Sequence, residues 1–228
     1  MKAMVLAAGR GDRLRPLTDR VPKALVRVGG KPLIAWHLER LRAAGVSHAV
    51  VNVSHLGEQI VDALGDGSRF GLRIRYSREP QPLETAGGIA TALPLLGGDN
   101  FLLVNADVYC ELDFRRLLGV SLADRLAHLV LVPNPPHRPA GDFGLANGLV
   151  SGANSAPRYT YAGLAVVSPA LVQGIGPGTK APLAPLLYAA ADRGLLSGEA
   201  YGGLWQDVGT AERLSQLESL LASRNEHC

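Results

Sequence analysis

The feature that most constrains the fold is the alternation, in the first half of the chain, of short apolar runs with longer segments of helical pattern. Residues 2–9 (KAMVLAAG) form an apolar run that ends at glycine, as buried strands do, whereas residues 32–45 begin with proline and end with glycine, as helices do. The alternation continues with strands expected at 48–54, 72–76 and 100–107 and helices at 56–67, 84–97 and 114–123. This pattern predicts a mostly parallel sheet with helices on both faces.

The second half of the chain predicts antiparallel elements instead. Asn147-Gly148 between apolar residues is typical of a tight hairpin, and residues 134–142 are a loop rich in proline, histidine and glycine. Further strands are expected at 127–133, 159–168 and 200–209, and helices at 183–194 and 210–224. We expect an α/β fold in one domain, 1–228, with halves at about 1–125 and 126–228.

Composition excludes several classes of protein. The net charge of +3 comes from 23 basic and 20 acidic residues, and aromatic residues make up only 5%, so neither a basic stripe nor a stacking platform for nucleic acid is indicated. Cys110 and Cys228 are the only cysteines, which favours a reducing compartment. There is no signal peptide or membrane-length apolar run, so we expect a cytoplasmic protein with no membrane or nucleic-acid partner.

The loop after the first expected strand, LAAGRGDRLRPLT at 6–18, is suited to phosphate. Glycines let backbone N–H groups approach phosphate oxygens, and arginines add fixed positive charge. The loop is not a P-loop, because no lysine follows Gly9 or Gly11 at the required spacing. It is a poor dinucleotide fingerprint too, because residue 14 is leucine and the later acidic residue is missing.

The stretch AAGRGDRLRPLT…PK closely resembles the signature loop of the sugar-1-phosphate nucleotidyltransferases. That resemblance implies a Rossmann-like, GT-A-like mixed sheet in which the first half binds the nucleotide and a smaller antiparallel lobe binds the sugar. It also implies that Arg13 holds the β- and γ-phosphates and that Lys23 stabilises charge on the α-phosphate during catalysis. The residues that the resemblance assigns to UTP in this segment are Gly9, Gly11, Asp12, Arg13 and Lys23.

Two acidic residues are candidates to hold Mg²⁺, which neutralises phosphates in nucleotidyl transfer. Asp107, in FLLVNADV, follows an expected buried strand, where open α/β sheets bind ligands. The family carries Gly-Asp there, whereas this chain has Ala106 before the acid. Asp207, in WQDVGT, resembles the family's other metal ligand. The alternative for each acid is a structural role in its turn, with Thr210 capping the last helix.

The resemblance further assigns Glu84 and Gly88 to the base, and Asn105, Asp142 and Gly163 to the sugar phosphate. Glu84 alternatively belongs to the capped start of its helix, and His37 is expected to pack and not to bind a ligand. The similarity is strongest to members that transfer a uridylyl group to N-acetylmuramic acid 1-phosphate in peptidoglycan recycling. Alternatives are guanylyl, thymidylyl or cytidylyl transfer to another phosphate such as mannose or glucose 1-phosphate, or a non-catalytic nucleotide-binding subunit. We expect a monomer or weak homo-oligomer.

Overall fold

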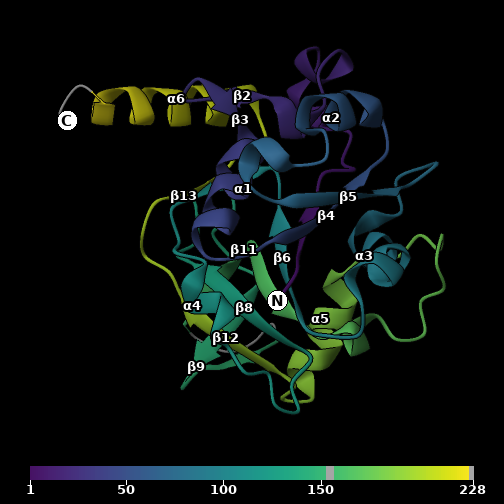
Figure 1. Cartoon of the computed structure of the whole chain (residues 1–228). Coiled ribbons are helices and arrows are strands. Elements are labelled where there is room, and N and C mark those ends of the chain that lie inside the picture. Colours follow the sequence, from purple (N-terminus) through teal and green to yellow (C-terminus); the bar gives the residue numbers. More distant parts are fainter. Residues whose placement is uncertain (153–156, 226–228) are drawn as a thin grey trace.

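The computed structural model describes residues 1–152 and 157–225. One nine-stranded mixed sheet runs through both halves of the chain in the order β5-β4-β1-β6-β11-β8-β12-β10-β9 (Figure 1). Its strands are β1 (Ala3–Leu6), β4 (His48–Val53), β5 (Arg73–Arg78), β6 (Phe101–Asn105), β8 (Ala127–Val132), β9 (Phe143–Ala146), β10 (Leu149–Ser151), β11 (Arg158–Val167) and β12 (Leu196–Ala200). The expected α/β class is confirmed.

The first half of the chain supplies the parallel part of the sheet. Strand β1 pairs in parallel with both β4 and β6, so that Leu6 lies opposite Asn52 on one side and Asn105 on the other. Strand β5 extends this block beyond β4, again in parallel. The carboxyl ends of these strands therefore meet at one edge of the sheet, where polar residues end otherwise apolar runs.

The second half continues the same sheet with mostly antiparallel strands. Strand β11 runs antiparallel to both β6 and β8, and β12 pairs in parallel with β8. The hairpin at Asn147-Gly148 is confirmed: it joins β9 to β10, and both turn residues have positive φ, 51° and 75°, as a type I′ turn requires. Strand β11 therefore places the second half of the chain directly beside β6, the last of the parallel strands in this block.

Two expected elements differ from the structure. The strand expected at 200–209 is confirmed only in part: β12 ends at Ala200, the chain bends at Gly203, and β13 (Trp205–Asp207) forms a short separate strand. Strand β13 pairs with β7 (Val108–Cys110) in a separate antiparallel ribbon. The helix expected at 114–123 shortens to α4 (Arg115–Leu118), because Gly119 follows it directly.

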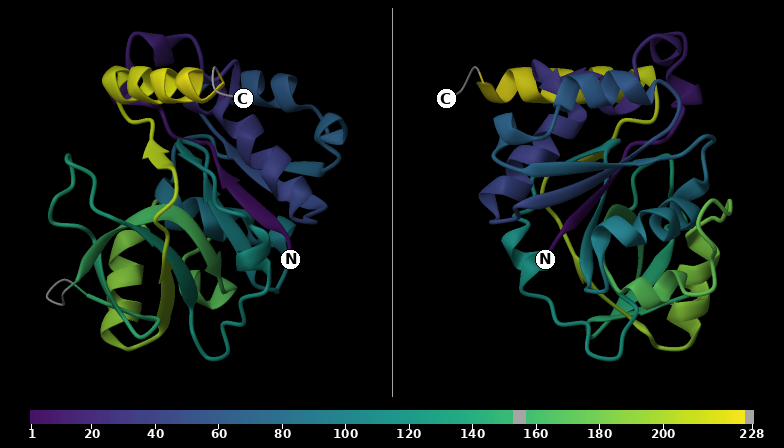
Figure 2. Two further views of the ribbon diagram at one scale, coloured as in Figure 1. Left: turned by 90° about the vertical axis from the view of Figure 1, so that its left-hand side faces the viewer. Right: turned by 45° about the vertical axis from the view of Figure 1, so that its right-hand side comes forward.

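Helices cover both faces of the sheet (Figure 2). One core contains buried side chains of α1 (Leu33–Ala43), α2 (Gly57–Leu64) and α4 against the sheet. The opposite core contains those of α3 (Glu84–Leu96) and α5 (Ala184–Asp192). Because both faces are apolar, the central strands are buried nearly throughout, which explains their continuous apolar runs.

A third, smaller core lies under α6 (Ala211–Asn225), which runs along the top of the molecule in Figure 1. Leu217 and Leu221 of α6 pack against Val28 and the ribbon residue Tyr109. Val28 belongs to a hairpin of β2 (Arg27–Val28) and β3 (Lys31–Pro32). This core therefore fixes the C-terminal helix and the β7–β13 ribbon to the N-terminal loops.

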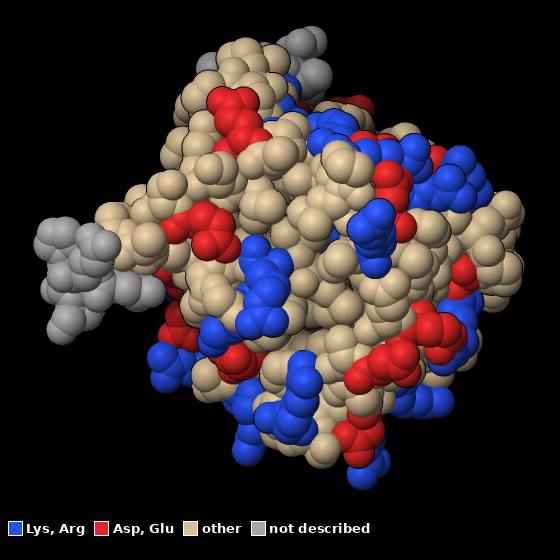
Figure 3. Space-filling view, turned by 90° about the horizontal axis from the view of Figure 1, so that it is seen from above, with Lys and Arg blue, Asp and Glu red and all other residues tan. Residues whose placement is uncertain are grey.

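The surface is mixed in charge. On the face shown in Figure 3, basic and acidic side chains are interspersed. Across residues 1–152 and 157–225, no helix combines the length and the apolar character needed to span a bilayer.

Candidate active site

Cavities open at the carboxyl edge of the parallel strands. Cavity A lies over the ends of β1, β4 and β6, and its polar lining residues include Lys23, Asn52, Glu79, Glu84, Thr85, Asn105 and Asp107. Cavity B adjoins it, and its ionisable lining residues are Arg13, Asp107, His137, Arg138, Asp207 and Arg213. Asn105 and Asp107 line both cavities, so the end of β6 lies where they meet.

The loop after β1 turns sharply at Gly11, which has φ of +70°. The Gly11 carbonyl accepts hydrogen bonds from the Leu14 N–H and the Thr18 hydroxyl, both at 2.8 Å. A Cβ at position 11 would lie 2.9 Å from the Thr18 side chain, so both the backbone angle and the space require glycine. Gly9 lines cavity A and faces open space, and Arg13 reaches cavity B.

Asp12 does not join these residues. Its carboxylate lies 2.9 Å from the Arg15 guanidinium and is largely exposed, and it lines neither cavity A nor cavity B. A carboxylate facing a triphosphate would also repel it. The expectation that Asp12 contacts the nucleotide thus has no support in this arrangement.

Lys23 reaches across the site to Asp107. A short 3-10 turn at Lys23–Leu25 directs the lysine inward, where its Nζ lies 2.5 Å from Asp107 Oδ2. The Lys23 side chain is 12% exposed, whereas that of Asp107 is 42% exposed. The ammonium group is therefore held inside the site while the carboxylate keeps an open side.

The two acids expected to bind metal are brought to one cavity by the β7–β13 ribbon. Asp207 lies opposite Val108 in the ribbon, and the Val208 N–H donates to the Asp107 carbonyl at 2.8 Å. Both side chains line cavity B. No group of three or more metal-binding side chains occurs in the described ranges, so a metal here would have two protein carboxylates.

The surroundings of Asp207 fit a cation. Oδ2 lies 3.3 Å from Arg213 Nη1, and Oδ1 lies 3.1 Å from His137 Nε2. Oδ1 is nevertheless buried and receives no hydrogen bond. A buried carboxylate oxygen without a donor is costly unless a ligand satisfies it. With two carboxylates and phosphate oxygens from a substrate, the donor set is that preferred by a hard divalent ion.

A buried side-chain network joins the phosphate loop to the start of α3. Asn52 Oδ1 accepts from the Ala7 N–H at 2.8 Å, and Asn52 Nδ2 donates to Glu79 Oε1 at 2.7 Å. Glu79 Oε2 in turn accepts from the Leu83 N–H at 3.0 Å. Gly88 lies directly behind this pair, because a Cβ there would be 2.7 Å from Glu79 Oε1. Gly88 thus makes room for the network and is itself buried in α3.

Glu84 begins α3 with a strained backbone. Its φ is +59°, unusual for a residue with a side chain, and its carboxylate lies 3.5 Å from Lys180 Nζ. The segment carrying Lys180 is tied to this turn, since the Ala181 N–H donates to the Leu83 carbonyl and the Ala181 carbonyl accepts from Gly87. Glu84 is therefore fixed at the edge of cavity A.

The residues expected to bind the sugar phosphate line two adjoining cavities, with Asn105 and Gly163 in cavity B. Cavity C is lined by Asn105 and Asp142 among others. Gly163, with φ of +76° at the irregularity in β11, lies against Asn105, and a Cβ there would be 2.9 Å from the Asn105 amide nitrogen. Gly163 therefore makes room for Asn105. The Asp142 carboxylate accepts a hydrogen bond from the Tyr161 N–H at 2.9 Å and another from Arg138 Nη1 at 2.9 Å.

His37 packs in the core, as expected. It is fully buried on α1, its Nε2 lies 2.7 Å from the Val108 carbonyl, and its ring stacks on Phe114. Burial lowers its pKa to about 4, the Val108 hydrogen bond opposing this and nearby Arg40 adding to it. The neutral ring thus supports β7, which leads directly from Asp107.

Several residues at this edge were not singled out from the sequence. Asn52 carried a weak signal, since it is a polar residue within an apolar run, whereas Glu79, Arg138, His137 and Arg213 carried none beyond their residue type. Their positions depend on contacts between distant segments.

Comparison with known proteins gives consistent findings. The nucleotidyl transferase family model matches residues 2–152. The chain is 50% identical to the N-acetylmuramate alpha-1-phosphate uridylyltransferase of Neisseria meningitidis serogroup B, over 96% of this chain and 98% of that protein. The protein of the same name from Caulobacter vibrioides is 37% identical over 96% of each. A solved structure titled as a glucose-1-phosphate thymidylyltransferase from Bacillus anthracis has a TM-score of 0.84 at 21% identity, covering 97% of this chain and 95% of that one, which supports the fold alone.

Proposed function

This chain belongs to the nucleotidyl transferase family, and on that premise we propose that it transfers the uridylyl group of UTP to N-acetylmuramic acid 1-phosphate. The products are UDP-N-acetylmuramic acid and pyrophosphate. The names of the Neisseria and Caulobacter relatives support this choice of sugar and nucleotide. As a step of peptidoglycan recycling, the reaction belongs in the cytoplasm and needs only small-molecule substrates, with the chain a monomer or weak homo-oligomer.

One observation carries the reaction class. Lys23 contacts Asp107, and the β7–β13 ribbon brings Asp207 to the cavity that Asp107 and Arg13 also line. Cations for a triphosphate and acids for a metal therefore meet at the end of β6. A protein that only bound nucleotide for regulation would not need the triphosphate-binding cations and the metal-binding acids together at one place.

The chemistry needs no nucleophile or base from the protein. A phosphate oxygen of the sugar 1-phosphate, already anionic, attacks the α-phosphorus of UTP, and the bond to the β-phosphate oxygen breaks. Lys23 stabilises the charge that builds on the α-phosphate, and Arg13 holds the departing pyrophosphate. Catalysis then rests on positioning and charge neutralisation.

Asp107 and Asp207 are the residues that would hold Mg²⁺. When bound, the ion would neutralise phosphate charge and help to orient the two substrates. Lys23 keeps Asp107 directed into the site, and Arg213 does the same for Asp207.

The remaining assignments divide the chain between its two substrates. In this single domain, the first half, about 1–125, binds UTP with Gly9 and Glu84 in cavity A, while Gly11 shapes the phosphate loop and Gly88 lies behind the base site. The second half, about 126–228, supplies Asp142 and Gly163 to the sugar site, and Asn105 at the end of β6 completes this site from the first half.

The experiment is a matrix of pyrophosphate release with UTP, GTP, CTP and dTTP, each paired with N-acetylmuramic acid, N-acetylglucosamine, glucose or mannose 1-phosphate, or with phosphocholine. The proposal predicts that UTP with the muramic acid substrate has the highest kcat/KM. A different preferred pair would replace the substrates but keep the reaction class. Nucleotide binding without pyrophosphate from any pair would overturn the enzyme assignment in favour of a regulatory subunit.

A further inference from the structure

Cavity C combines an apolar wall with few charges. Its apolar lining residues include Phe143, Leu183, Leu187 and Tyr188, and the rings of Phe143 and Tyr188 lie 4.9 Å apart. The charged residues that line it are Glu84, Arg138 and Asp142, so Arg138 is its one cationic lining residue in the described part of the chain. An anionic group on a ligand in this cavity would have to face Arg138 or be repelled.

Arg138 is held in place for such a contact. Its Nη1 lies 2.9 Å and 3.0 Å from the two oxygens of Asp142. Asp142 is itself anchored to β11 by the Tyr161 N–H, and its side chain is only 18% exposed. The loop on which both residues lie is secured by Arg158, which donates to the carbonyls of Ala140, Gly141 and Asp142.

The guanidinium still has donors to offer. Within residues 1–152 and 157–225, Asp142 is the only side chain that pairs with Arg138, and it takes Nη1 alone. Nε and Nη2 therefore remain for a ligand, and a guanidinium binds a carboxylate through two such N–H groups. Arg138 lines both cavity B and cavity C, so it lies between the phosphate end and the sugar end of the site.

From this arrangement we infer that Arg138 recognises the lactyl carboxylate of N-acetylmuramic acid 1-phosphate. The inference rests on the proposed function. The carboxylate distinguishes this substrate from other amino sugar 1-phosphates, while the lactyl and acetyl methyl groups suit the apolar wall. Arg13 and Lys23 serve the phosphates from cavities A and B. Of the other cations nearby, Lys180 lies 3.5 Å from Glu84 and Arg213 lies 3.3 Å from Asp207.

The main test compares two substrates that differ only in the lactyl ether, N-acetylmuramic acid 1-phosphate and N-acetylglucosamine 1-phosphate. In Arg138→Gln, kcat/KM with the muramic acid substrate should fall about ten- to a hundredfold, the size of a lost charge-assisted hydrogen bond. With the glucosamine substrate the change should stay below about threefold. An equal fall with both substrates would overturn the inference and assign Arg138 to the sugar's phosphate.

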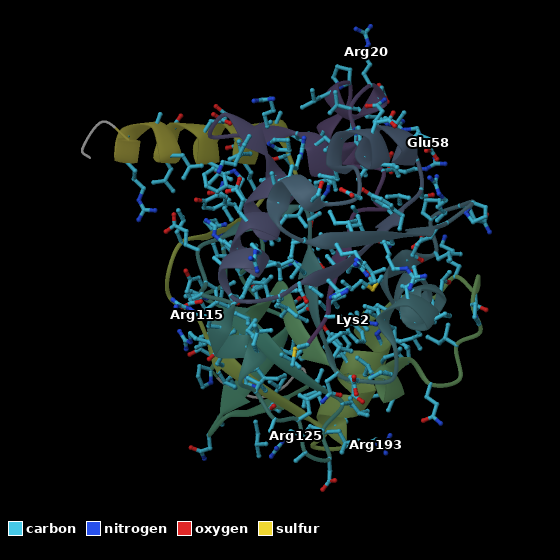
Figure 4. The ribbon with its side chains drawn as sticks, viewed as in Figure 1. Lys2, Arg20, Glu58, Arg115, Arg125 and Arg193 are labelled. Atoms are coloured by element: carbon cyan, nitrogen blue, oxygen red, sulfur yellow. The ribbon has the colours of Figure 1, made fainter. Side chains whose placement is uncertain are left out.

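The matched control is Arg193→Gln. Arg193 follows the far end of α5, the helix whose first residue, Ala184, lines cavity C, and Figure 4 shows Arg193 at the bottom of the molecule. This variant should keep both kcat/KM values of the wild type. A change equal to that of the Arg138 variant would mean that general loss of positive charge, and not a contact, explains the result.

A second arm changes the substrate and needs no variant to fold. Wild type should use the methyl ester of the lactyl carboxylate about ten- to a hundredfold less well than the free acid, whereas Arg138→Gln should barely distinguish them. Equal use of ester and acid by wild type would overturn the inference alone. If wild type released no pyrophosphate from the muramic acid substrate, the proposed function itself would fail, and the two failures are distinguishable.

Discussion

Lys23 and Asp107 lie 84 positions apart in the chain, yet Lys23 Nζ approaches Asp107 Oδ2 to 2.5 Å. The contact joins the segment after the phosphate loop to the residue just beyond β6. It holds a cation and an acid side by side at the junction of cavities A and B. Each of the two can therefore be tested for a separate role in the same reaction.

Replacement of Lys23 by alanine should lower turnover more than it raises the apparent KM for UTP. If the ammonium stabilises charge that develops on the α-phosphate, the loss in kcat should be on the order of a hundred- to a thousandfold. Steady-state kinetics of pyrophosphate release measure both constants. Lys31→Ala, which removes an exposed lysine paired with Glu39, is the control and should leave them unchanged. An unaltered kcat in Lys23→Ala would remove Lys23 from catalysis.

Replacement of Asp107 by asparagine should weaken the response to Mg²⁺. The midpoint of activity against Mg²⁺ concentration should rise on the order of ten- to a hundredfold, the size found when even an outer-shell partner of a metal ligand is lost. A chelator should abolish wild-type activity and added Mg²⁺ should restore it. Asp99→Asn, at an exposed loop position, should keep the wild-type midpoint. The same midpoint in both variants would refute the metal role of Asp107.

Replacement of Gly163 by alanine should destabilise the fold. The backbone there has φ of +76°, and the new Cβ would lie 2.9 Å from the Asn105 amide. Together these should lower the free energy of unfolding by about 1–3 kcal/mol, measured by urea denaturation. Gly98→Ala, where a Cβ meets nothing within 4 Å, should leave stability unchanged or slightly raised. Equal effects of the two substitutions would show that Asn105 does not depend on Gly163.

His37 should make stability depend on pH below about 6.5. Its pKa is 6.5 when unfolded and about 4 in the fold, because burial opposes the charged ring. Above pH 6.5 His37 is neutral in both the folded and the unfolded chain, so it does not reduce the free energy of unfolding. As the pH falls from 6.5 towards 4, only the unfolded chain takes up the proton, so the free energy of unfolding should fall by up to about 1.4 kcal/mol per pH unit.

The measurement is urea denaturation of wild type and His37→Gln at several pH values between 4 and 7. Glutamine keeps an N–H donor for the Val108 carbonyl but does not titrate. The variant should have the smaller dependence of stability on pH in this range. Identical slopes for the two proteins would contradict the assignment of the effect to His37.

Elements with a strong local pattern were predictable from the sequence. The parallel strands β1, β4 and β6 are apolar runs long enough to indicate burial, and the β9–β10 hairpin follows from two residues that tolerate positive φ. The ribbon of β7 and β13 was not predictable, because its pairing joins segments about a hundred residues apart and each strand is only three residues long.

The site was predictable in its location but less so in the role of each residue. Gly88 and Gly163 were expected to touch substrate. The structure adds that a Cβ at either position would crowd a neighbouring polar side chain, and that Gly163 lines cavity B. What a glycine leaves room for depends on tertiary neighbours, which one sequence does not reveal. For the same reason Arg138 was missed, since its place between two cavities depends on its partner Asp142.

The β7–β13 ribbon has a consequence for when the site comes into being. As the polypeptide leaves the ribosome, Lys23 and Asp107 emerge well before Asp207, which follows all nine strands of the large sheet. A nascent chain can therefore close its phosphate loop but cannot pair its two acids. The acid pair is completed only when β13 docks on β7, so catalytic competence would require that all nine strands of the sheet have been made and that the ribbon has formed.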